Sequence, residues 1–169
     1  MISSKSTLPR KDQMNQVQLK ITTQLGPLYL IASDQALNGV YWTKQSAPMM
    51  TTKMTPAAKI LKTAQLQLEE YFDGQRKNFD LPLNAEGTKF QMSVWKQLRK
   101  INYGSTQSYK DIATKIHNKN ASRAVGTANR HNPLCIVIHC HRVISSDGSL
   151  GGYSGGLEIK KNLLKLEKI

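Results

Sequence analysis

Residues 136–144 have the sequence IVIHCHRVI, and the interpretation of the whole chain starts from this stretch. Apolar β-branched residues flank it on both sides, as in a buried strand or a tightly packed loop. Four polar, reactive side chains interrupt the apolar run, namely His139, Cys140, His141 and Arg142. Because burying such groups without partners is costly, we expect them to line a site.

Cys140 is the candidate nucleophile of that site. A thiolate is the reactive form of cysteine, and a nearby arginine or protonated histidine lowers the thiol pKa. His141 is a candidate base for the thiol proton, provided that a third group orients it. The alternative is a buried cysteine that packs as a small hydrophobe. We favour that alternative for Cys135, which lies between two apolar residues.

A metal site is the second interpretation of this region. The possible ligands are His131, Cys135, His139, Cys140 and His141. Strand alternation, however, predicts His139 and His141 on one face and Cys140 on the other. Adjacent residues rarely reach one ion, and the chain has no CxxC pair. We therefore expect neither a metal nor a cofactor.

The composition limits the class of protein. A chain of 169 residues makes one or two small domains, and two cysteines do not make a disulfide framework. The first residues lack the apolar segment of a secretion signal, and no apolar run reaches membrane-spanning length. We expect a cytoplasmic, monomeric protein that has no membrane partner.

The net charge of +13 is unevenly distributed. Residues 1–84 contain 10 Lys and Arg against 6 Asp and Glu, whereas residues 85–169 contain 14 against 5. The second half therefore carries +9 of the total. A basic half favours a polyanionic partner, most simply nucleic acid.

The first half has the pattern of a small α/β unit. Three apolar, partly alternating stretches predict an antiparallel meander, at residues 17–21, 28–32 and 39–42. A helix is predicted from Pro56 to the Asp73-Gly74 stop signal. We see no reactive cluster here and assign the aromatic residues to the core. Residues 1–15 are expected to be loose.

The second half begins after a linker at residues 78–88 and is mostly helical. Thr88 is expected to cap a helix whose apolar stripe runs from Phe90 to Ile101, and Ser108 with Asp111 forms a capping-box pattern. The next helix, residues 121–130, has two contrasting faces. Its apolar face is predicted to contain Ala121, Ala124, Val125 and Ala128; its polar face contains Arg123, Gly126, Thr127 and Arg130. A basic face with little bulk suits close approach to DNA.

A hairpin-type turn at residues 145–148 and a glycine-rich loop at residues 151–156 follow the cysteine. The loop lacks the Walker spacing and its Lys-Ser/Thr pair, which excludes a nucleotide P-loop. A final helix is predicted from about Leu157, with Ile159, Leu163 and Leu166 inward. Glu167 near its end is a candidate to orient His141.

Together these motifs resemble the O6-alkylguanine-DNA alkyltransferase family, the methylated-DNA–protein-cysteine methyltransferases. Over residues 88–167 the motifs match those of the family closely, in the same order and with the same spacing. The first half of the chain matches the family only in the layout of its predicted elements. The residues that carry it are Tyr109, Arg123-Ala124-Val125-Gly126, Asn129, Asn132-Pro133, Cys140-His141-Arg142-Val143, Gly151-Gly152-Tyr153-Ser154-Gly155-Gly156-Leu157 and Glu167.

The resemblance implies a fold of class α/β + α with two domains. Residues 1–84 would form a small ribonuclease-H-like α/β domain, and residues 85–169 a winged helix-turn-helix domain with the active cysteine. It also implies repair by direct reversal of damage. The protein would flip O6-alkylguanine, and O4-alkylthymine, out of double-stranded DNA and transfer the alkyl group irreversibly to Cys140 in a single turnover.

Roles for individual residues also come from the resemblance. His141 would act through water as the base for Cys140, and Glu167 would orient His141. Tyr109 would crowd the phosphate of the flipped nucleotide and assist departure of the guanine. The expected DNA-binding residues are Arg123, which fills the space left by the flipped base, Gly126, Thr127, Arg130 and Asn132, which holds the turn after the helix. Tyr153, Ser154 and Val143 would line the base pocket.

One position departs from the family pattern. The family usually has proline immediately before the cysteine, whereas this chain has His139. The histidine restores an N–H donor and adds a titratable group. A zinc site known in some relatives needs ligands in the N-terminal half, and residues 1–84 contain neither Cys nor His.

Two other functions stay open at this point. One is a non-catalytic winged-helix DNA-binding module, which predicts salt-dependent DNA affinity without covalent change. The other is a thiol hydrolase using Cys140, His141 and Glu167, which predicts an accumulating acyl-enzyme and leaves the basic helix unexplained.

Overall fold

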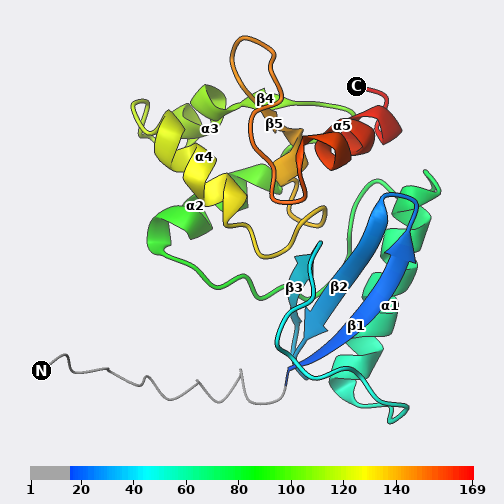
Figure 1. Ribbon diagram of the computed structural model, residues 1–169. Helices are drawn as coiled ribbons and strands as arrows, with labels where there is room; N and C mark the ends of the chain where they lie inside the picture. The colour runs from blue at the N-terminus through cyan, green and yellow to red at the C-terminus, as the bar shows by residue number, and fades with distance from the viewer. Residues whose placement is uncertain (1–15) are drawn as a thin grey trace, which may run out of the picture.

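The computed structural model describes residues 16–169 and places a three-stranded sheet in the first part of the chain (Figure 1). The strands β1 (Val17–Thr23), β2 (Gly26–Ala32) and β3 (Leu37–Tyr41) are antiparallel in the order β1-β2-β3. The predicted meander is therefore confirmed, with longer first strands than the sequence indicated. The prediction for residues 1–15 lies outside the described residues.

Helix α1 (Pro56–Phe72) packs against β1 and β2 (Figure 1). Pro56 begins the helix as predicted, and the Thr55 side chain, which was not predicted as a cap, accepts a hydrogen bond from the Ala58 amide. Gly74 has φ +73°, the left-handed conformation that favours glycine after a helix. The buried face of α1 also contains Tyr71, close to the C-terminal end of the helix.

The second part of the chain is built on α2 (Lys89–Leu98), α3 (Tyr109–Lys115) and α4 (Ser122–Arg130). The predicted capping box of Ser108 with Asp111 forms at α3, and the predicted cap Thr88 forms a second capping box with Gln91 at α2. Helix α4 packs against α2 and α3, and the Trp95 indole N–H donates to the Ala128 carbonyl at 2.8 Å. Helix α5 (Leu157–Leu166) closes the chain.

The stretch around Cys140 is mainly the tightly packed loop, one of the two structures that its pattern allowed. Ile136 has φ +71°, and residues Cys140–Arg142 form a 3₁₀ turn. Only β5 (Val143–Ile144) is a strand, and it pairs in parallel with β4 (Gln107–Ser108). Residues 139–141 do not belong to a strand, so strand alternation does not separate His139 and His141 from Cys140, and all three are buried.

Two smaller predictions were wrong. The helix predicted through Ile101 ends at Leu98, although Ile101 is buried beyond it. Ala124 on α4 is exposed, and the buried residues of that helix are Val125, Ala128 and Asn129. On α5 the inward face is confirmed, because Leu163 is buried and Ile159 and Leu166 pack against the core; Lys160 is buried as well.

The two parts of the chain meet at β3. The Val40 amide donates to the Pro133 carbonyl at 2.8 Å, and the Cys135 amide donates to the Val40 carbonyl at 3.2 Å. One hydrophobic cluster contains buried residues from both parts. The segment that leads to Cys140 is therefore held against the N-terminal sheet by backbone hydrogen bonds.

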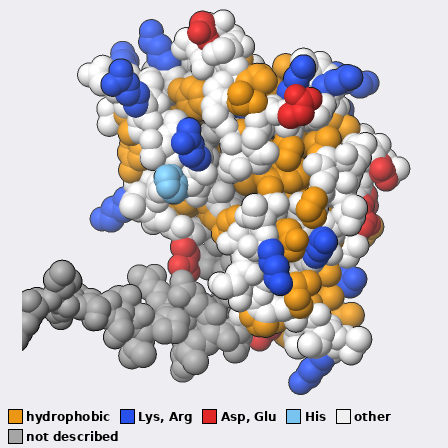
Figure 2. All heavy atoms as spheres, in the orientation of Figure 1, with side chains coloured by type: hydrophobic (Ala, Val, Ile, Leu, Met, Phe, Trp, Pro, Cys, Tyr) orange, Lys and Arg blue, Asp and Glu red, His pale blue; other side chains and the backbone are white. Residues whose placement is uncertain are grey.

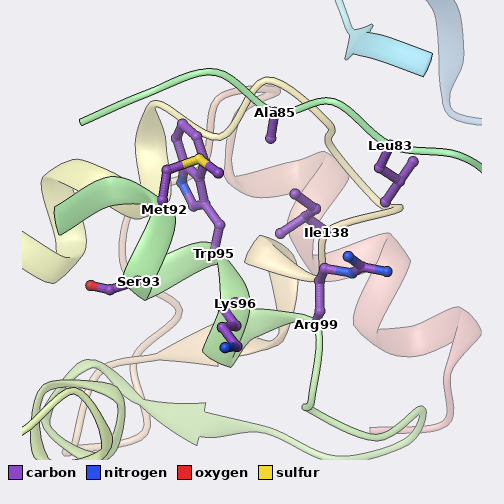
Figure 3. Close-up of a pocket in the computed structure, with 8 residues that line it drawn as sticks. All are labelled: Leu83, Ala85, Met92, Ser93, Trp95, Lys96, Arg99 and Ile138. Atoms are coloured by element: carbon purple, nitrogen blue, oxygen red, sulfur yellow. The ribbon is translucent and has the colours of Figure 1, made fainter. Parts of the chain in front are cut away.

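A groove of about 430 Å³ lies between α2 and the segment that precedes it (Figure 3). Met92, Trp95 and Arg99 come from α2 and its C-terminal end, Leu83 and Ala85 come from the preceding segment, and Ile138 lines the same space. None of the residues predicted for the site lines this groove, so we assign it no part in the chemistry.

Candidate active site and DNA-binding face

Cys140 lies at the start of the 3₁₀ turn and is 1% exposed. Its amide donates to the Ile138 carbonyl at 2.7 Å, and its carbonyl accepts from the Asn129 side-chain amide at 3.2 Å. A hydrogen bond from the Cys135 thiol lowers the pKa of Cys140. The side chain of Asn132, the charge of Lys160 and the Ile136 amide act in the same direction, against burial. This thiol is therefore prepared to ionise.

His141 and Glu167 are joined as predicted. The Nε2 atom of His141 and the Oε1 atom of Glu167 are 2.8 Å apart, and both side chains are fully buried. Burial lowers the pKa of His141, although Glu167 opposes that effect. The Nδ1 atom of His141 has no hydrogen-bond partner among residues 16–169. The ring is thus oriented through one nitrogen, and the other is free to exchange a proton.

Glu167 has more partners than sequence reasoning indicated. Arg142 donates from Nε to Oε2 at 2.9 Å and from Nη2 to Oε1 at 3.0 Å. The Tyr71 hydroxyl donates to Oε1 at 2.7 Å. Burial raises the pKa of Glu167, but the hydrogen bonds from His141 and Arg142 outweigh it and hold that pKa well below its usual range. Glu167 is therefore a charged carboxylate at the centre of a buried network.

Two members of this network were missed. Tyr71 comes from α1, in the half where we saw no reactive group, and burial together with Glu167 raises its pKa. A buried tyrosine hydroxyl needs a partner, and that was the available signal. In the sequence analysis, Arg142 was considered only as a group that lowers the pKa of the Cys140 thiol. In the structure it binds Glu167, and its Nη1 donates to the Ile101 carbonyl at 2.6 Å.

Lys160 is a further buried cation that the sequence analysis did not select. Its ammonium group donates to the carbonyls of Val143 and Leu150, and burial lowers its pKa to about 8. It also lies 6.0 Å from the centre of the Tyr109 ring. These contacts tie α5 to the strand that follows Cys140 and to the glycine-rich loop.

The glycine-rich loop packs against Tyr109. Gly151 has φ +65°, and a Cβ there would lie 2.6 Å from the Tyr109 hydroxyl, so glycine is required for both reasons. Tyr153 is buried and accepts a hydrogen bond from the Trp42 indole at 3.3 Å. Ser154 is exposed, with its hydroxyl 3.2 Å from the Cys135 sulfur. Val143 is buried beside the 3₁₀ turn.

The polar face of α4 lies next to this loop. Arg123, Thr127 and Arg130 are exposed, and Gly126 is partly so. All four line a cavity of about 310 Å³ that Tyr109, His131 and Gly152 complete. On the face in Figure 2, Lys and Arg side chains lie both at the edge and within the face, with hydrophobic surface between them.

Asn132 holds the turn between α4 and the cysteine. Its side-chain amide donates to the Ile138 carbonyl at 2.9 Å, and its Oδ1 accepts from the Leu134 amide at 3.0 Å. Asn132 is buried, so it supports the site from beneath and is not part of the exposed face. The structure thus brings the predicted residues together around Cys140 and along α4.

Comparison with known proteins agrees with this arrangement. The family model described as "6-O-methylguanine DNA methyltransferase, DNA binding domain" matches residues 89–169, and the model for the ribonuclease-like domain matches residues 18–85. The methylated-DNA–protein-cysteine methyltransferase of Methanosarcina barkeri is 46% identical over 149 residues, covering 88% of this chain and 94% of that protein. The chain belongs to the 6-O-methylguanine DNA methyltransferase family.

Solved structures of this methyltransferase family have the same two-part fold. The crystal structure of Mycobacterium tuberculosis O6-methylguanine methyltransferase has a TM-score of 0.79 and 40% identity, covering 90% of this chain and 93% of that chain. The crystal structure of M. tuberculosis OGT in complex with DNA has a TM-score of 0.78 and 42% identity, covering 88% and 91%.

Residues 16–169 contain neither a cluster that would hold a metal ion nor a helix that would span a membrane. No three His, Cys, Asp or Glu side chains within residues 16–169 converge in a way that would hold a metal ion. Over the same range, no helix combines the length and apolarity needed to span a membrane.

His139, which stands where the family usually has proline, is buried and neutral. Burial, with the nearby charge of Arg142, lowers its pKa from 6.5 to about 3. Its Nδ1 atom has no hydrogen-bond partner within residues 16–169. It therefore does not supply a positive charge to Cys140 near neutral pH.

The buried histidines predict a loss of stability in acid. Below pH of about 6.5 the unfolded chain protonates His139 and His141, whereas the folded protein does not until its lowered pKa values are reached. The unfolded state then binds more protons, so the free energy of unfolding falls as pH falls, by about 1.4 kcal/mol per pH unit for each histidine. Urea unfolding between pH about 6.5 and about 3 measures this slope.

His139→Asn should reduce the slope of the free energy of unfolding against pH by the contribution of one histidine, about 1.4 kcal/mol per pH unit. His117→Asn is the matched control, because His117 is exposed and its φ of +59° suits asparagine. Equal slopes for His139→Asn and the wild-type protein would contradict the assignment of a buried neutral His139.

Proposed function

We propose that this protein repairs DNA by accepting an alkyl group from O6-alkylguanine, and from O4-alkylthymine, onto Cys140. The observation that carries the proposal is the buried Cys140, which precedes the His141 that pairs with Glu167 and is hydrogen-bonded through its carbonyl to Asn129 of α4, the helix with the exposed basic face. A nucleophile of this kind acts on a base only if the base leaves the stack, which costs a few kcal/mol and least for a damaged base.

The transfer follows from the residues around the thiol. His141 takes up the thiol proton at Nδ1, directly or through water, while Glu167 stabilises the resulting imidazolium. The Cys140 sulfur attacks the alkyl carbon, and the bond from that carbon to O6 breaks. The electron pair of that bond stays on O6 of the guanine, and the guanine takes up the proton that His141 removed from the thiol. Tyr109, which packs against the glycine-rich loop, assists this departure.

The product explains why one molecule acts once. Cys140 becomes a thioether, which has no carbonyl for water to attack. None of the described groups around Cys140 would break the carbon–sulfur bond. The protein is therefore consumed in stoichiometric proportion to the damage that it repairs.

The second half of the chain supplies the DNA contacts. We propose that residues 85–169 form a winged helix-turn-helix domain, with residues 1–84 as a ribonuclease-H-like domain. In this arrangement α4 enters the minor groove and Arg123 fills the space left by the flipped base. Gly126 and Thr127 permit close approach, Arg130 contacts phosphate, and Asn132 holds the turn. Tyr153, Ser154 and Val143 line the base pocket.

Mass spectrometry tests the proposed transfer. After mixing with a duplex that contains O6-methylguanine, the tryptic peptide 131–142 should gain one methylene, in stoichiometric amount, with the added mass on Cys140. The same duplex without the damage is the control. Tight binding without a mass change would favour the non-catalytic DNA-binding module, and turnover of acyl substrates would favour the thiol hydrolase.

The proposed DNA contact of α4 predicts a change in salt dependence. Arg130→Ala should weaken binding to duplex DNA and reduce the slope of log affinity against log salt by about one for each phosphate that the arginine neutralises, because Arg130 is the residue that we place on phosphate. Lys59→Ala, at an exposed lysine on α1, removes the same charge away from α4. Fluorescence anisotropy over a salt series measures both, and equal slopes for the two variants would contradict the proposed contact.

A further inference from the structure

The first half of the chain contributes one aromatic side chain to the glycine-rich loop. Trp42 follows directly after β3 and is half-buried. Its indole N–H donates to the Tyr153 hydroxyl at 3.3 Å. The sequence analysis assigned the aromatic residues of this half to the core, and Trp42 does pack against the core. Its polar N–H nevertheless belongs to the loop that follows Cys140.

Gly155 lies against the same indole. A Cβ at this position would lie 2.6 Å from both Cδ1 and Nε1 of Trp42 and 3.0 Å from its Cγ. Carbon atoms in contact lie about 3.5–4.0 Å apart, so no Cβ fits between the loop and the ring. The neighbouring Gly156 has φ +92°, whereas Gly155 does not have a positive φ. Space alone therefore requires glycine at residue 155, and Trp42 occupies that space.

The other end of the loop is held by the second half of the chain. A Cβ at Gly151 would lie 2.6 Å from the Tyr109 hydroxyl, and a Cβ at Gly152 would lie 3.0 Å from Nη2 of Arg130. Residues 153–154, which we place in the base pocket, lie between these contacts and those of the indole. The part of the loop that would face the base is therefore held at both of its ends.

The end of β3 also contacts the segment that leads to the alkyl acceptor. Val40, two residues before Trp42, accepts a hydrogen bond from the Cys135 amide at 3.2 Å. The Cys135 sulfur in turn lies 3.2 Å from the Ser154 hydroxyl of the loop. The strand that positions Trp42 is thus tied both to the segment before Cys140 and, through that segment, to the loop after it.

We propose that Trp42 limits the size of the alkyl group that Cys140 accepts. This inference rests on the proposed function, in which Tyr153 lines the base pocket. A group larger than methyl needs Tyr153 or the loop to shift. Gly155 has no room to move toward the indole, and movement of Tyr153 away from the indole breaks their hydrogen bond. Trp42 is a positioning residue, because it acts on the substrate through the loop.

Transfer rates for two alkyl groups test this proposal. Full-length protein is mixed with a duplex that contains O6-methylguanine or O6-benzylguanine, and the gain in mass on Cys140 is followed in a single turnover. Trp42→Ala should raise the ratio of the benzyl rate to the methyl rate by about 10-fold, the lower end of what a change in pocket contacts is worth. A variant that is merely less stable would lose both rates together. An unchanged ratio would therefore overturn the proposal.

Two further variants define the cause of the change in ratio. Trp42→Phe keeps most of the ring and removes the donor, so its ratio should lie between those of the wild-type protein and Trp42→Ala. It also keeps the test decisive if the alanine variant does not fold, because a wild-type ratio for Trp42→Phe would then overturn the proposal. Tyr29→Ala is the matched control, since it removes a half-buried aromatic ring from β2 of the same sheet. An equal rise for this control would overturn the assignment to Trp42.

Gly155→Ala tests the contact from the side of the loop. The added methyl group meets the indole, so the loop must shift, and methyl transfer should slow by about 10- to 100-fold, since a misplacement of about 1 Å costs up to about 100-fold. In the presence of Trp42→Ala the methyl group has room, and the same change should have little effect. Equal slowing with and without the indole would overturn the proposal.

The wild-type protein separates failure of this proposal from failure of the proposed function. Absence of methyl transfer by the wild-type protein would refute the proposed function, and the limit on the alkyl group with it. Methyl transfer by the wild-type protein, together with wild-type ratios in both Trp42 variants, would refute the role of Trp42 alone.

Discussion

Cys140→Ser should abolish alkyl transfer while leaving the protein folded and able to bind DNA. A serine hydroxyl fits the space of the thiol and keeps one hydrogen-bonding group, but it does not ionise to a nucleophile comparable to a thiolate. The contacts of α4 and the His141–Glu167 pair do not involve the sulfur. Binding to a duplex with O6-methylguanine should therefore persist without covalent change.

Two measurements check this result. Mass spectrometry of the peptide 131–142 should show no methylene on either residue 140 or Cys135, and anisotropy should show an affinity for the damaged duplex close to that of the wild-type protein. Methyl addition to Cys135 in the variant would contradict the assignment of Cys140 as the acceptor. If the variant lost DNA binding as well as methyl transfer, the sulfur would be shown to support the structure of the site.

Glu167→Gln should be the most destabilising single change in this site. Glu167 balances the buried Arg142 and also accepts from His141 and Tyr71. Gln has the same size but no charge, so the guanidinium of Arg142 stays buried without a counter-ion. Breaking a buried ion pair in this way costs about 3–5 kcal/mol. The same change releases His141 from its fixed orientation, and alkyl transfer should slow.

Urea unfolding measures the stability change, and single-turnover methyl transfer measures the rate. Glu158→Gln is the matched control on the same helix, because Glu158 is exposed and contributes at most about 1 kcal/mol to the N-terminus of α5. Arg142→Met combined with Glu167→Gln should recover part of the stability but not the rate. A stability loss for Glu167→Gln no larger than for Glu158→Gln would contradict the central role of this carboxylate.

Local signals in the sequence predicted most helices correctly. Thr88, Ser108 and Pro56 each begin a helix through contacts within three or four residues, and such contacts are visible in the sequence. The alternating first strands and the Asp73-Gly74 stop are of the same kind. The polar face of α4 was also predictable, because helical periodicity alone places Arg123, Thr127 and Arg130 together.

The stretch around Cys140 was harder, for a physical reason. Its apolar β-branched residues allowed either a buried strand or a tightly packed loop, and contacts from β3 and Asn132 hold the loop, in which Ile136 has positive φ. Tertiary contacts therefore override the local preference. The chemistry of the site was predicted because residue types determine it, whereas the geometry depends on distant segments.

The contacts of Glu167 were also only partly predictable from the sequence. Its pairing with His141 was predicted from the resemblance, but Tyr71 lies 96 positions away and Arg142 lies 25 away. No periodicity connects these residues. Only the hydrogen bond from Tyr71 on α1 to Glu167 shows that the N-terminal part contributes a donor to the buried network.

That contribution limits how freely the two halves can be exchanged between relatives. Tyr71 reaches Glu167 from one half, and Val40 exchanges backbone hydrogen bonds with Pro133 and Cys135 in the other. A chimaera that joins the first domain of one relative to the second domain of another keeps the reactive cysteine. Its two domains must also form these hydrogen bonds with each other. Selection for a reactive Cys140 therefore acts on residues in both domains, so we expect them to evolve as one unit.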